Sequence, residues 1–231
     1  GGFMVVALAL VLAVRPDPRR IAELLDARRD EQAALPAAPL RELLRRPGVV
    51  PALVAAQASF GVMVGLMTLT GAVVVDHHGH EGHLVFPIIG AHVLGMYALV
   101  LVVGDLVDRI GRTPSLYAGL ALMAASAASL LWVHAVLATA VTLFALGLGW
   151  NLSFVAATAE LADSTGVAER GRLLGFNDLL SGMTGATLAL GGGLALSEWG
   201  PDALALGGTL LVLLPALWIA TTTRPPRREA A

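Results

Sequence analysis

The sequence predicts an all-α integral membrane protein, and three observations lead to this prediction. The 231 residues are 56% hydrophobic and only 14% charged, with a mean hydropathy of +0.76, whereas soluble domains carry about 25% charged residues. Apolar runs of roughly the 20 residues that a helix needs to cross about 30 Å of hydrocarbon recur along the chain. Because these runs lack two-residue alternation, helices rather than a barrel satisfy the backbone inside lipid.

We expect seven transmembrane helices, six of them complete and one partial. The spans are residues 1–14, 49–75, 84–103, 116–133, 135–157, 173–196 and 203–223. The first is apolar from its first residue and is not preceded by the basic segment of a signal peptide, so we expect it to be part of a helix in a longer protein. Residues 15–48 form a charged linker on one membrane face, and residues 224–231 form a tail.

The basic residues predict the orientation of these spans. All fifteen are arginine, and they occupy the linker 15–48, the connections around 104–115 and 158–172, and the tail. The intervening connections, at 76–83, at His134 and at 197–202, contain none. Arginine and lysine concentrate in short cytoplasmic loops. This separation therefore predicts a cytoplasmic C-terminus.

Composition and motifs also argue against several function classes. The net charge of −2 gives no sign of the basic patch that a nucleic-acid partner requires, and the absence of cysteine excludes thiolate chemistry. A seven-helix membrane enzyme is one alternative, but neither H-E-x-x-H nor G-x-S-x-G occurs. We expect no enzymatic activity and no cofactor.

Residues 104–115 read GDLVDRIGRTPS and are expected to form a tight turn between two spans. Gly104 and Gly111 permit a sharp turn and close helix approach, and Asp108 can accept hydrogen bonds at a helix N-terminus. Arg109 and Arg112 can pair with acidic side chains or lipid headgroups.

The spacing of this segment resembles the signature loop of the major facilitator superfamily (MFS), G-x-x-x-D-R-x-G-R-[RK]. The matching residues are Gly104, Asp108, Arg109, Gly111 and Arg112. Thr113 stands where the family has a second basic residue, as in many second-half copies. Residues 92–98 (HVLGMYA), 147–161 (GLGWNLSFVAATAEL) and 175–186 (GFNDLLSGMTGA) look similar to a bacterial drug-efflux-like branch of the family.

The resemblance covers the whole chain and implies its organisation. In the family the signature loop lies between the second and third helices of each six-helix half. The chain then resembles the last helix of an N-terminal half, the central loop and a complete C-terminal half, that is, a fragment of a transporter. The implied function is alternating-access transport of a small molecule in the bacterial inner membrane, with proton-coupled efflux by antiport. The implied partners are this substrate, protons, the lipid bilayer and the missing N-terminal half.

Candidate substrate contacts follow from the family fold, in which the first and fourth helices of each half face the cavity. The polar or aromatic residues on those two helices are Gln57, Ser59, Thr68, Trp150, Asn151 and Ser153. At ~1.5 Å per residue, Gln57 lies ~12 Å and Asn151 ~9 Å from the inner ends of their helices. They are therefore expected to form one polar patch beside Trp150. Hydrogen bonding between helices is the alternative role for these residues.

Asp178 and His92 are the candidates for proton coupling. Asp178 is expected one to two turns inside the cytoplasmic end of its helix, where desolvation would raise the pKa of a carboxyl group. Its alternative role is to cap a helix or to pair with an arginine at a gate. His92 has a side chain that titrates near physiological pH, with helix packing as its alternative role.

Four histidines crowd the connection at 76–83, namely His77, His78, His80 and His83. Imidazole clusters bind zinc or copper, so a metal-ion transporter of another fold is the second alternative. Gly79 and Gly82 make this connection flexible, so we expect no helix to hold these ligands at a fixed spacing. We therefore expect a solvated loop and assign no metal site.

Overall fold

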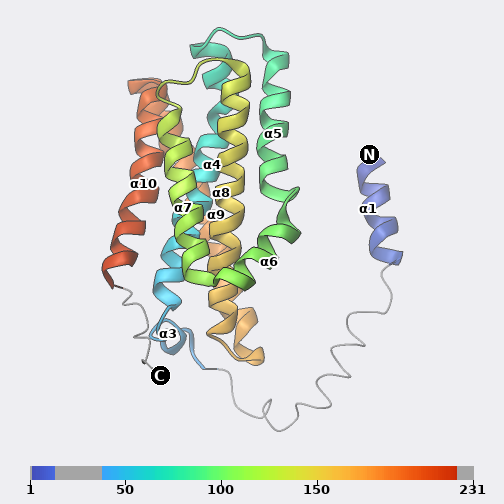
Figure 1. The fold of residues 1–231 in the computed structure, drawn as a ribbon, viewed down its shortest axis with the longest axis vertical. Helices are drawn as coiled ribbons and strands as arrows, with labels where there is room; N and C mark the ends of the chain where they lie inside the picture. Colours follow the sequence, from blue (N-terminus) through green and yellow to red (C-terminus); the bar gives the residue numbers. More distant parts are fainter. Residues whose placement is uncertain (1, 14–37, 223–231) are drawn as a thin grey trace. The chain divides into compact units, whose positions relative to one another are not determined.

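The computed structural model describes residues 2–13 and 38–222, and all regular elements in these ranges are helices (Figure 1). The chain divides into two units, residues 1–38 and 39–231. In the first unit, α1 (Gly2–Ala13) is a 12-residue apolar helix without charged residues. The predictions made for linker residues 15–37 and for the tail 224–231 lie outside the described residues.

The second unit is a bundle of helices. Its α-helices are α3 (Leu40–Leu43), α4 (Val49–Ala72), α5 (Val85–Tyr97), α6 (Val100–Ile110), α7 (Arg112–Ser129), α8 (Val136–Asp163), α9 (Val167–Trp199) and α10 (Pro201–Thr222). A π-helical turn (Val73–His77) continues α4, and a short 3-10 helix (Gly82–Leu84) precedes α5. Among the described residues, four helices are long and apolar enough to cross a membrane, or five if the bent pair α5 and α6 is one span. The expected number was seven. The 18-residue α7 is not among them, because it begins with the polar segment 112–115 and ends at Ser129, before the apolar residues 130–133 of the predicted span.

One predicted span is broken. Residues 84–103 were expected to form a single helix, but α5 and α6 meet at Ala98 and Leu99 with a bend of 41°. Leu99 has φ −106° and ψ 12°, outside the helical region, so the regular hydrogen bonding is interrupted there. The apolar composition of a segment does not predict such a change of helix direction.

The ends of two spans also differ from the prediction. The span expected at 135–157 continues to Asp163, and the one expected at 173–196 runs from Val167 to Trp199. Arg170 and Arg172 therefore lie on the first turns of α9 and not in a loop. An apolar run stops at its first charged residues, whereas helical hydrogen bonding continues wherever charged side chains can reach water.

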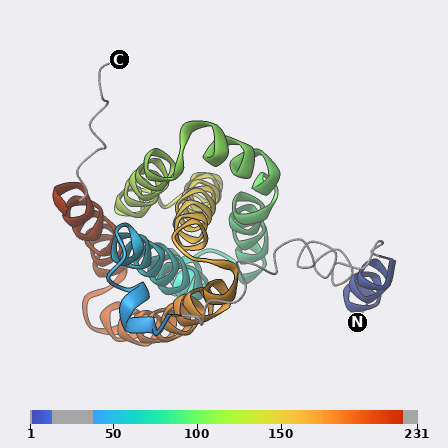
Figure 2. The ribbon, with the colours of Figure 1, turned by 90° about the horizontal axis from the view of Figure 1, so that it is seen from below.

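Helix α8 lies in the middle of the bundle, against α4, α5 and α7 (Figure 2). Glycine allows these close crossings. A Cβ at Gly149 would lie 2.9 Å from the carbonyl oxygen of Gly119 on α7, and one at Gly147 would overlap the carbonyl oxygen of His92 on α5. Helix α9 covers another side of α4, and α10 packs against α4 and α7.

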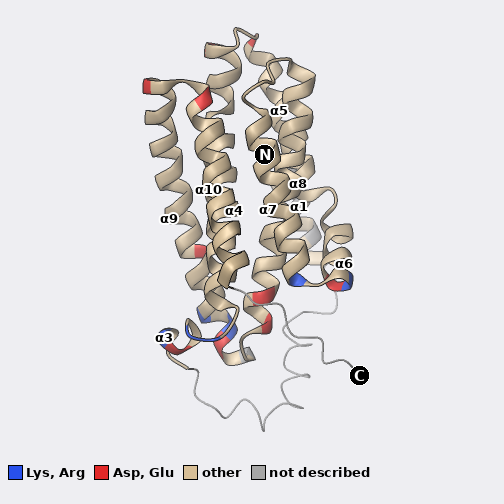
Figure 3. Ribbon diagram, turned by 60° about the vertical axis from the view of Figure 1, so that its left-hand side comes forward, with Lys and Arg blue, Asp and Glu red and all other residues tan. Residues whose placement is uncertain are grey.

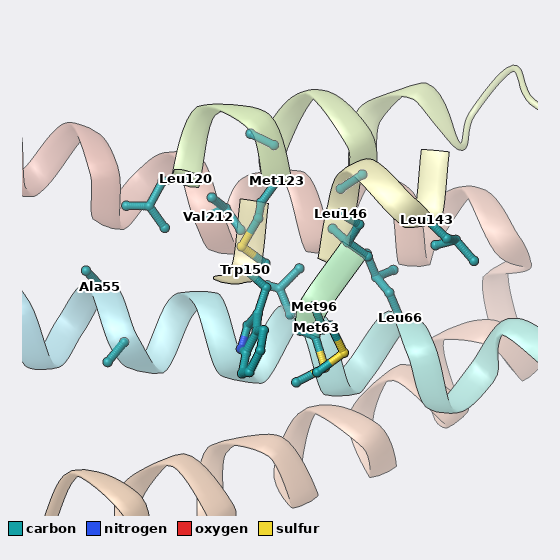
Figure 4. Packing of buried hydrophobic residues seen from close by; sticks show 14 of the residues in the cluster. Ala55, Met63, Leu66, Met96, Leu120, Met123, Leu143, Leu146, Trp150 and Val212 are labelled. Atoms are coloured by element: carbon teal, nitrogen blue, oxygen red, sulfur yellow. The ribbon is translucent and has the colours of Figure 1, made fainter. Parts of the chain in front are cut away.

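The core consists of apolar side chains between these helices (Figure 4). Leu120, Met123, Leu143 and Leu146 are at most 1% exposed and come from α7 and α8. Trp150 is a buried member of the same cluster. The core therefore positions Trp150 against the partly buried side chains described below.

The described arginines gather at one end of the bundle, around α3, the junction of α6 and α7, and the start of α9 (Figure 3). The opposite end carries acidic residues and histidines but no arginine among the described residues. We call these the arginine end and the histidine end. The alternation of arginine between connections thus corresponds to a separation in space.

Candidate functional site

The predicted signature loop is largely helical. Gly104 to Ile110 belong to α6, and Arg112 begins α7. Only Gly111 separates the two helices, with φ 95° and ψ 162°, a backbone conformation that favours glycine. The tight turn expected in this segment is confined to Gly111, because a single glycine at positive φ is enough to redirect the chain.

Arg112 joins three helices at the arginine end. Its guanidinium pairs with Asp108 on α6, and its Nε lies 3.1 Å from Asp163 Oδ2 at the end of α8. The hydrogen bond to Asp108 and then that to Asp163 raise the pKa of Arg112 above its ordinary value. Arg109 instead pairs with Asp105 on its own helix, at 2.8 Å, and both side chains are exposed. The signature residues therefore connect the junction of α6 and α7 to α8.

A second arginine, Arg46, connects the segment after α3 to the start of α9 at the same end. Arg46 donates two hydrogen bonds to the carboxylate of Glu169, at 2.6 and 2.9 Å, and one to the carbonyl oxygen of Ser164 at 3.0 Å. The hydrogen bond to Glu169 raises the pKa of Arg46. Glu169 also accepts a hydrogen bond from the amide of Gly166, at 3.1 Å. Sequence reasoning did not identify the pair of Arg46 and Glu169. The hydrogen bond from Gly166 is one half of a capping box, because glycine has no side chain to form the other half.

Gln57 contacts α9 rather than Asn151. Its amide nitrogen lies 3.1 Å from Asn177 Oδ1 and 3.3 Å from Ser181 Oγ. Its amide oxygen accepts a hydrogen bond from Thr184 at 3.3 Å. Asn177 Nδ2 is buried and has no hydrogen-bond partner among the described residues. The three α9 residues were not predicted, but their spacing of four and three residues places them on one helix face.

The remaining predicted cavity residues divide into buried and exposed ones. The hydroxyl groups of Ser59 and Ser153 are 2.8 Å apart and fully buried, joining α4 to α8. Asn151 is 1% exposed, and its Nδ2 has no partner among the described residues. Thr68 is exposed on α4. The structure therefore assigns the serines to contact between helices, and it does not bring Asn151 together with Gln57.

Trp150 belongs to an aromatic cluster built from three helices. Its ring stacks on Phe154, with centroids 5.2 Å apart and an angle of 15° between the planes. Phe60 on α4 lies 5.7 Å from Phe154, and Tyr97 on α5 lies 6.2 Å from Trp150. The indole nitrogen of Trp150 is buried without a hydrogen-bond partner among the described residues. Tyr97 is 57% exposed, so the cluster reaches the surface of the described bundle.

The aromatic cluster adjoins the polar group around Gln57. Phe60 follows Gln57 by one helical turn on α4. On α9, Gly185 follows Thr184, and a Cβ at Gly185 would lie 3.2 Å from the ring of Phe60. The two sets of side chains thus form a continuous surface on α4, α5, α8 and α9. We call this surface the aromatic–amide surface, and its side chains carry no formal charge.

The two proton-coupling candidates lie in different environments. His92 is fully buried, and its Nδ1 is 2.8 Å from the carbonyl oxygen of Leu143. A carbonyl can only accept, so Nδ1 carries the proton and donates it. Asp178 is exposed on α9, next to Asn177. No hydrogen bond or ion pair of the described residues joins Asp178 to His92.

The histidine connection contacts a segment that the sequence did not link to it. His78 Nε2 lies 3.3 Å from His134 Nδ1, and His80 Nε2 lies 2.8 Å from the carbonyl oxygen of His134. His83 pairs with Glu81 at 3.1 Å. Within residues 2–13 and 38–222, no group of three or more candidate ligands could hold a metal ion.

A cavity of about 170 Å³ lies elsewhere, between α4, α9 and α10. Its lining consists of glycine, alanine, valine and leucine. Without a polar side chain it offers no directional contact to a polar ligand.

Comparison with known proteins gives the family. The sequence profile described as Major Facilitator Superfamily matches residues 1–159 and 88–231. An uncharacterised MFS-type transporter of Bacillus subtilis strain 168, YdeG, is 33% identical over 92% of this chain and 50% of its own length. A second from the same strain, YddS, is 27% identical over 92% of the chain and 49% of its own length.

A third relative is the riboflavin transporter RfnT of Brucella anthropi, 35% identical over 62% of this chain and 35% of its own length. The chain thus spans about half the length of the two Bacillus relatives. These matches point to a transporter and not to an enzyme. The chain belongs to the Major Facilitator Superfamily of membrane transporters.

Proposed function

We propose that the chain is the last helix of the N-terminal half, the central linker and the C-terminal half of a secondary transporter. It works by alternating access in the bacterial inner membrane, with the C-terminus in the cytoplasm. The match of 92% of the chain to half of a relative supports this organisation. The gathering of the described arginines at one end supports the orientation.

The aromatic–amide surface is the substrate site in this proposal. The proposal rests on this surface, because it combines aromatic rings that can stack with hydrogen-bonding groups that lack partners among the described residues. Trp150 Nε1 and Asn177 Nδ2 are both buried donors without a partner among the described residues. A buried donor left unsatisfied costs about 1–3 kcal/mol, so an acceptor on the substrate would stabilise the complex.

The substrate class that fits this surface is a small amphipathic molecule with a planar ring and hydrogen-bond acceptors. Stacked aromatic pairs contribute about 0.5–1.5 kcal/mol beyond the area they bury. The relative named as a riboflavin transporter supports planar heteroaromatic compounds as the first class to test.

The substrate site can be tested with two tryptophan variants of the full-length transporter. Trp150→Leu removes the stacked ring and is expected to raise the KM for a planar aromatic substrate about tenfold, the equivalent of 1.4 kcal/mol. Trp132→Leu is the matched control, because Trp132 is 73% exposed and lies beyond α7. Equal KM values for the two variants would remove Trp150 from the site.

In this proposal Asp178 couples transport to protons, and the substrate is exported by proton-coupled efflux. Asp178 lies beside Asn177, on an exposed part of α9 where protons can reach it. His92 is less suited, because its ring is fully buried and its Nε2, which would take up the proton, has no hydrogen-bond partner among the described residues. In proteoliposomes, Asp178→Asn should abolish transport driven by a pH gradient but retain substrate binding.

Asp202→Asn is the control for this experiment, since Asp202 is an exposed acid at the start of α10. It should leave the transport rate unchanged. Undiminished pH-driven efflux by Asp178→Asn would exclude Asp178 from coupling.

A further inference from the structure

Histidines from distant parts of the sequence meet at the histidine end. Five of the six histidines in the chain lie there, at positions 77, 78, 80, 83 and 134. The rings of His78 and His134 are in edge-to-face contact, with centroids 4.9 Å apart. His80 ties the same connection to the carbonyl oxygen of His134. These contacts join the end of α4 to the turn between α7 and α8.

The contact between His78 and His134 requires that at least one of the two rings be uncharged. With Nε2 and Nδ1 only 3.3 Å apart, one nitrogen must accept the proton of the other. Two protonated rings would instead place two donors and two positive charges against each other. The His80 contact differs, because a protonated imidazole can still donate to a carbonyl oxygen.

The surroundings of His78 also disfavour its charge. Its ring lines a small cavity of about 40 Å³ together with mostly apolar side chains from α4, α8, α10 and the residue after α7, among them Leu66, Leu130 and Leu204. Its Nδ1 is buried without a partner among the described residues. Burial lowers the pKa of His78 below its ordinary value of 6.5, and His134, His80 and His77 lower it further.

We propose that the contact between His78 and His134 is a proton-operated clasp that holds the histidine end closed at neutral pH and releases it in acid. The sign follows from linkage. Because the pKa of His78 is lowered in the closed state, neutral His78 stabilises that state fully when the pH is above its ordinary pKa of 6.5. This stabilisation is lost as the pH falls from there through the lowered value.

The other titratable groups at the histidine end do not reverse the direction of this pH dependence. They are Asp76, His77, His80, Glu81, His83, Glu198 and Asp202. Glu81 is engaged with His83, and no carboxylate is among the groups that shift the pKa of His78. The clasp is independent of the substrate site proposed above, because it lies at the histidine end and involves neither the aromatic–amide surface nor Asp178.

The test is hydrogen exchange of the full-length protein in lipid nanodiscs at pH 7.5, 6.5 and 5.5, with exchange times scaled for the intrinsic pH dependence. In the wild type, exchange in residues 73–84 and 130–139 should rise below pH 6.5, by up to about tenfold per pH unit. Peptides at the arginine end should not change, which distinguishes clasp opening from acid unfolding.

Glutamine variants separate the clasp from a general acid effect. The double variant His78→Gln and His134→Gln can still hydrogen-bond but cannot be protonated, so its exchange should not respond to pH. His83→Gln is the control and should behave as the wild type. The proposal is overturned if the wild type shows no rise, if the double variant keeps the rise, or if the control loses it.

Discussion

The crossing of α5 and α8 allows a stability prediction from backbone geometry. A Cβ at Gly147 would overlap the carbonyl oxygen of His92 and lie 3.1 Å from the amide nitrogen of Met96. From the other helix, a Cβ at Gly95 would overlap the carbonyl oxygen of Phe144. The obstructing atoms are backbone atoms of a packed helix, so no rotamer change relieves the overlap. Gly147→Ala must therefore push the two helices apart.

The size of the effect follows from two opposing contributions. Adding a methyl group to a well-packed interior costs about 1–3 kcal/mol, and overlap with backbone places this substitution near the upper end. Alanine is favoured over glycine within a helix by about 1 kcal/mol. The net loss is about 2 kcal/mol, which corresponds to a fall of roughly 4–8 °C in the unfolding midpoint of a domain of this size.

The assay is thermal unfolding of the full-length protein in detergent, followed by tryptophan fluorescence. Gly90→Ala is the matched control, because Gly90 lies on α5 and a Cβ there meets no atom within 4 Å. The control should unfold at the wild-type temperature or up to a few degrees higher. Equal midpoints for Gly147→Ala and Gly90→Ala would refute the close approach of the two backbones.

Two further predictions concern polar contacts, both measured by the same unfolding assay. A double-mutant cycle with Ser59→Ala and Ser153→Ala should give a coupling energy of about 0.6 kcal/mol, the average for hydrogen bonds between membrane helices. Strict additivity of the two single effects would show that the hydroxyl groups do not interact. Arg46→Ala should destabilise the protein by about 1 kcal/mol, because it removes two hydrogen bonds between the guanidinium and the carboxylate of Glu169. The control Arg41→Ala, an exposed arginine on α3, should have no measurable effect, and equal losses for the two arginines would contradict the assigned pairing.

The sequence alone predicted those features that depend on a single local property, such as the length of an apolar run or the spacing of a motif. Long apolar runs predicted α4, α8, α9 and α10, because a backbone in lipid must satisfy its own hydrogen bonds. The signature spacing predicted the family, which the profile match confirms. The bend at Leu99 was not predicted, and neither was the helical conformation of most of the signature segment, since both depend on backbone angles that hydropathy does not report.

The candidate site was predicted less completely. Trp150 and Gln57 were identified as residues in an apolar span, but their partners were not. Equal depth suggested Asn151 as the neighbour of Gln57, yet depth alone leaves the direction around the helix axis open. Packing of α4 against α9 turned Gln57 toward Asn177.

What the sequence by itself determined is therefore one-dimensional: which segments are apolar enough to be helices, where arginine alternates between connections, and which family the spacing resembles. The tertiary structure decided which helix faces meet. It joined Gln57 to Asn177, Arg46 to Glu169 and His78 to His134. These contacts link residues 56 to 123 positions apart, so they depend on helix rotation and crossing geometry, which are set by glycine contacts and core packing rather than by local composition.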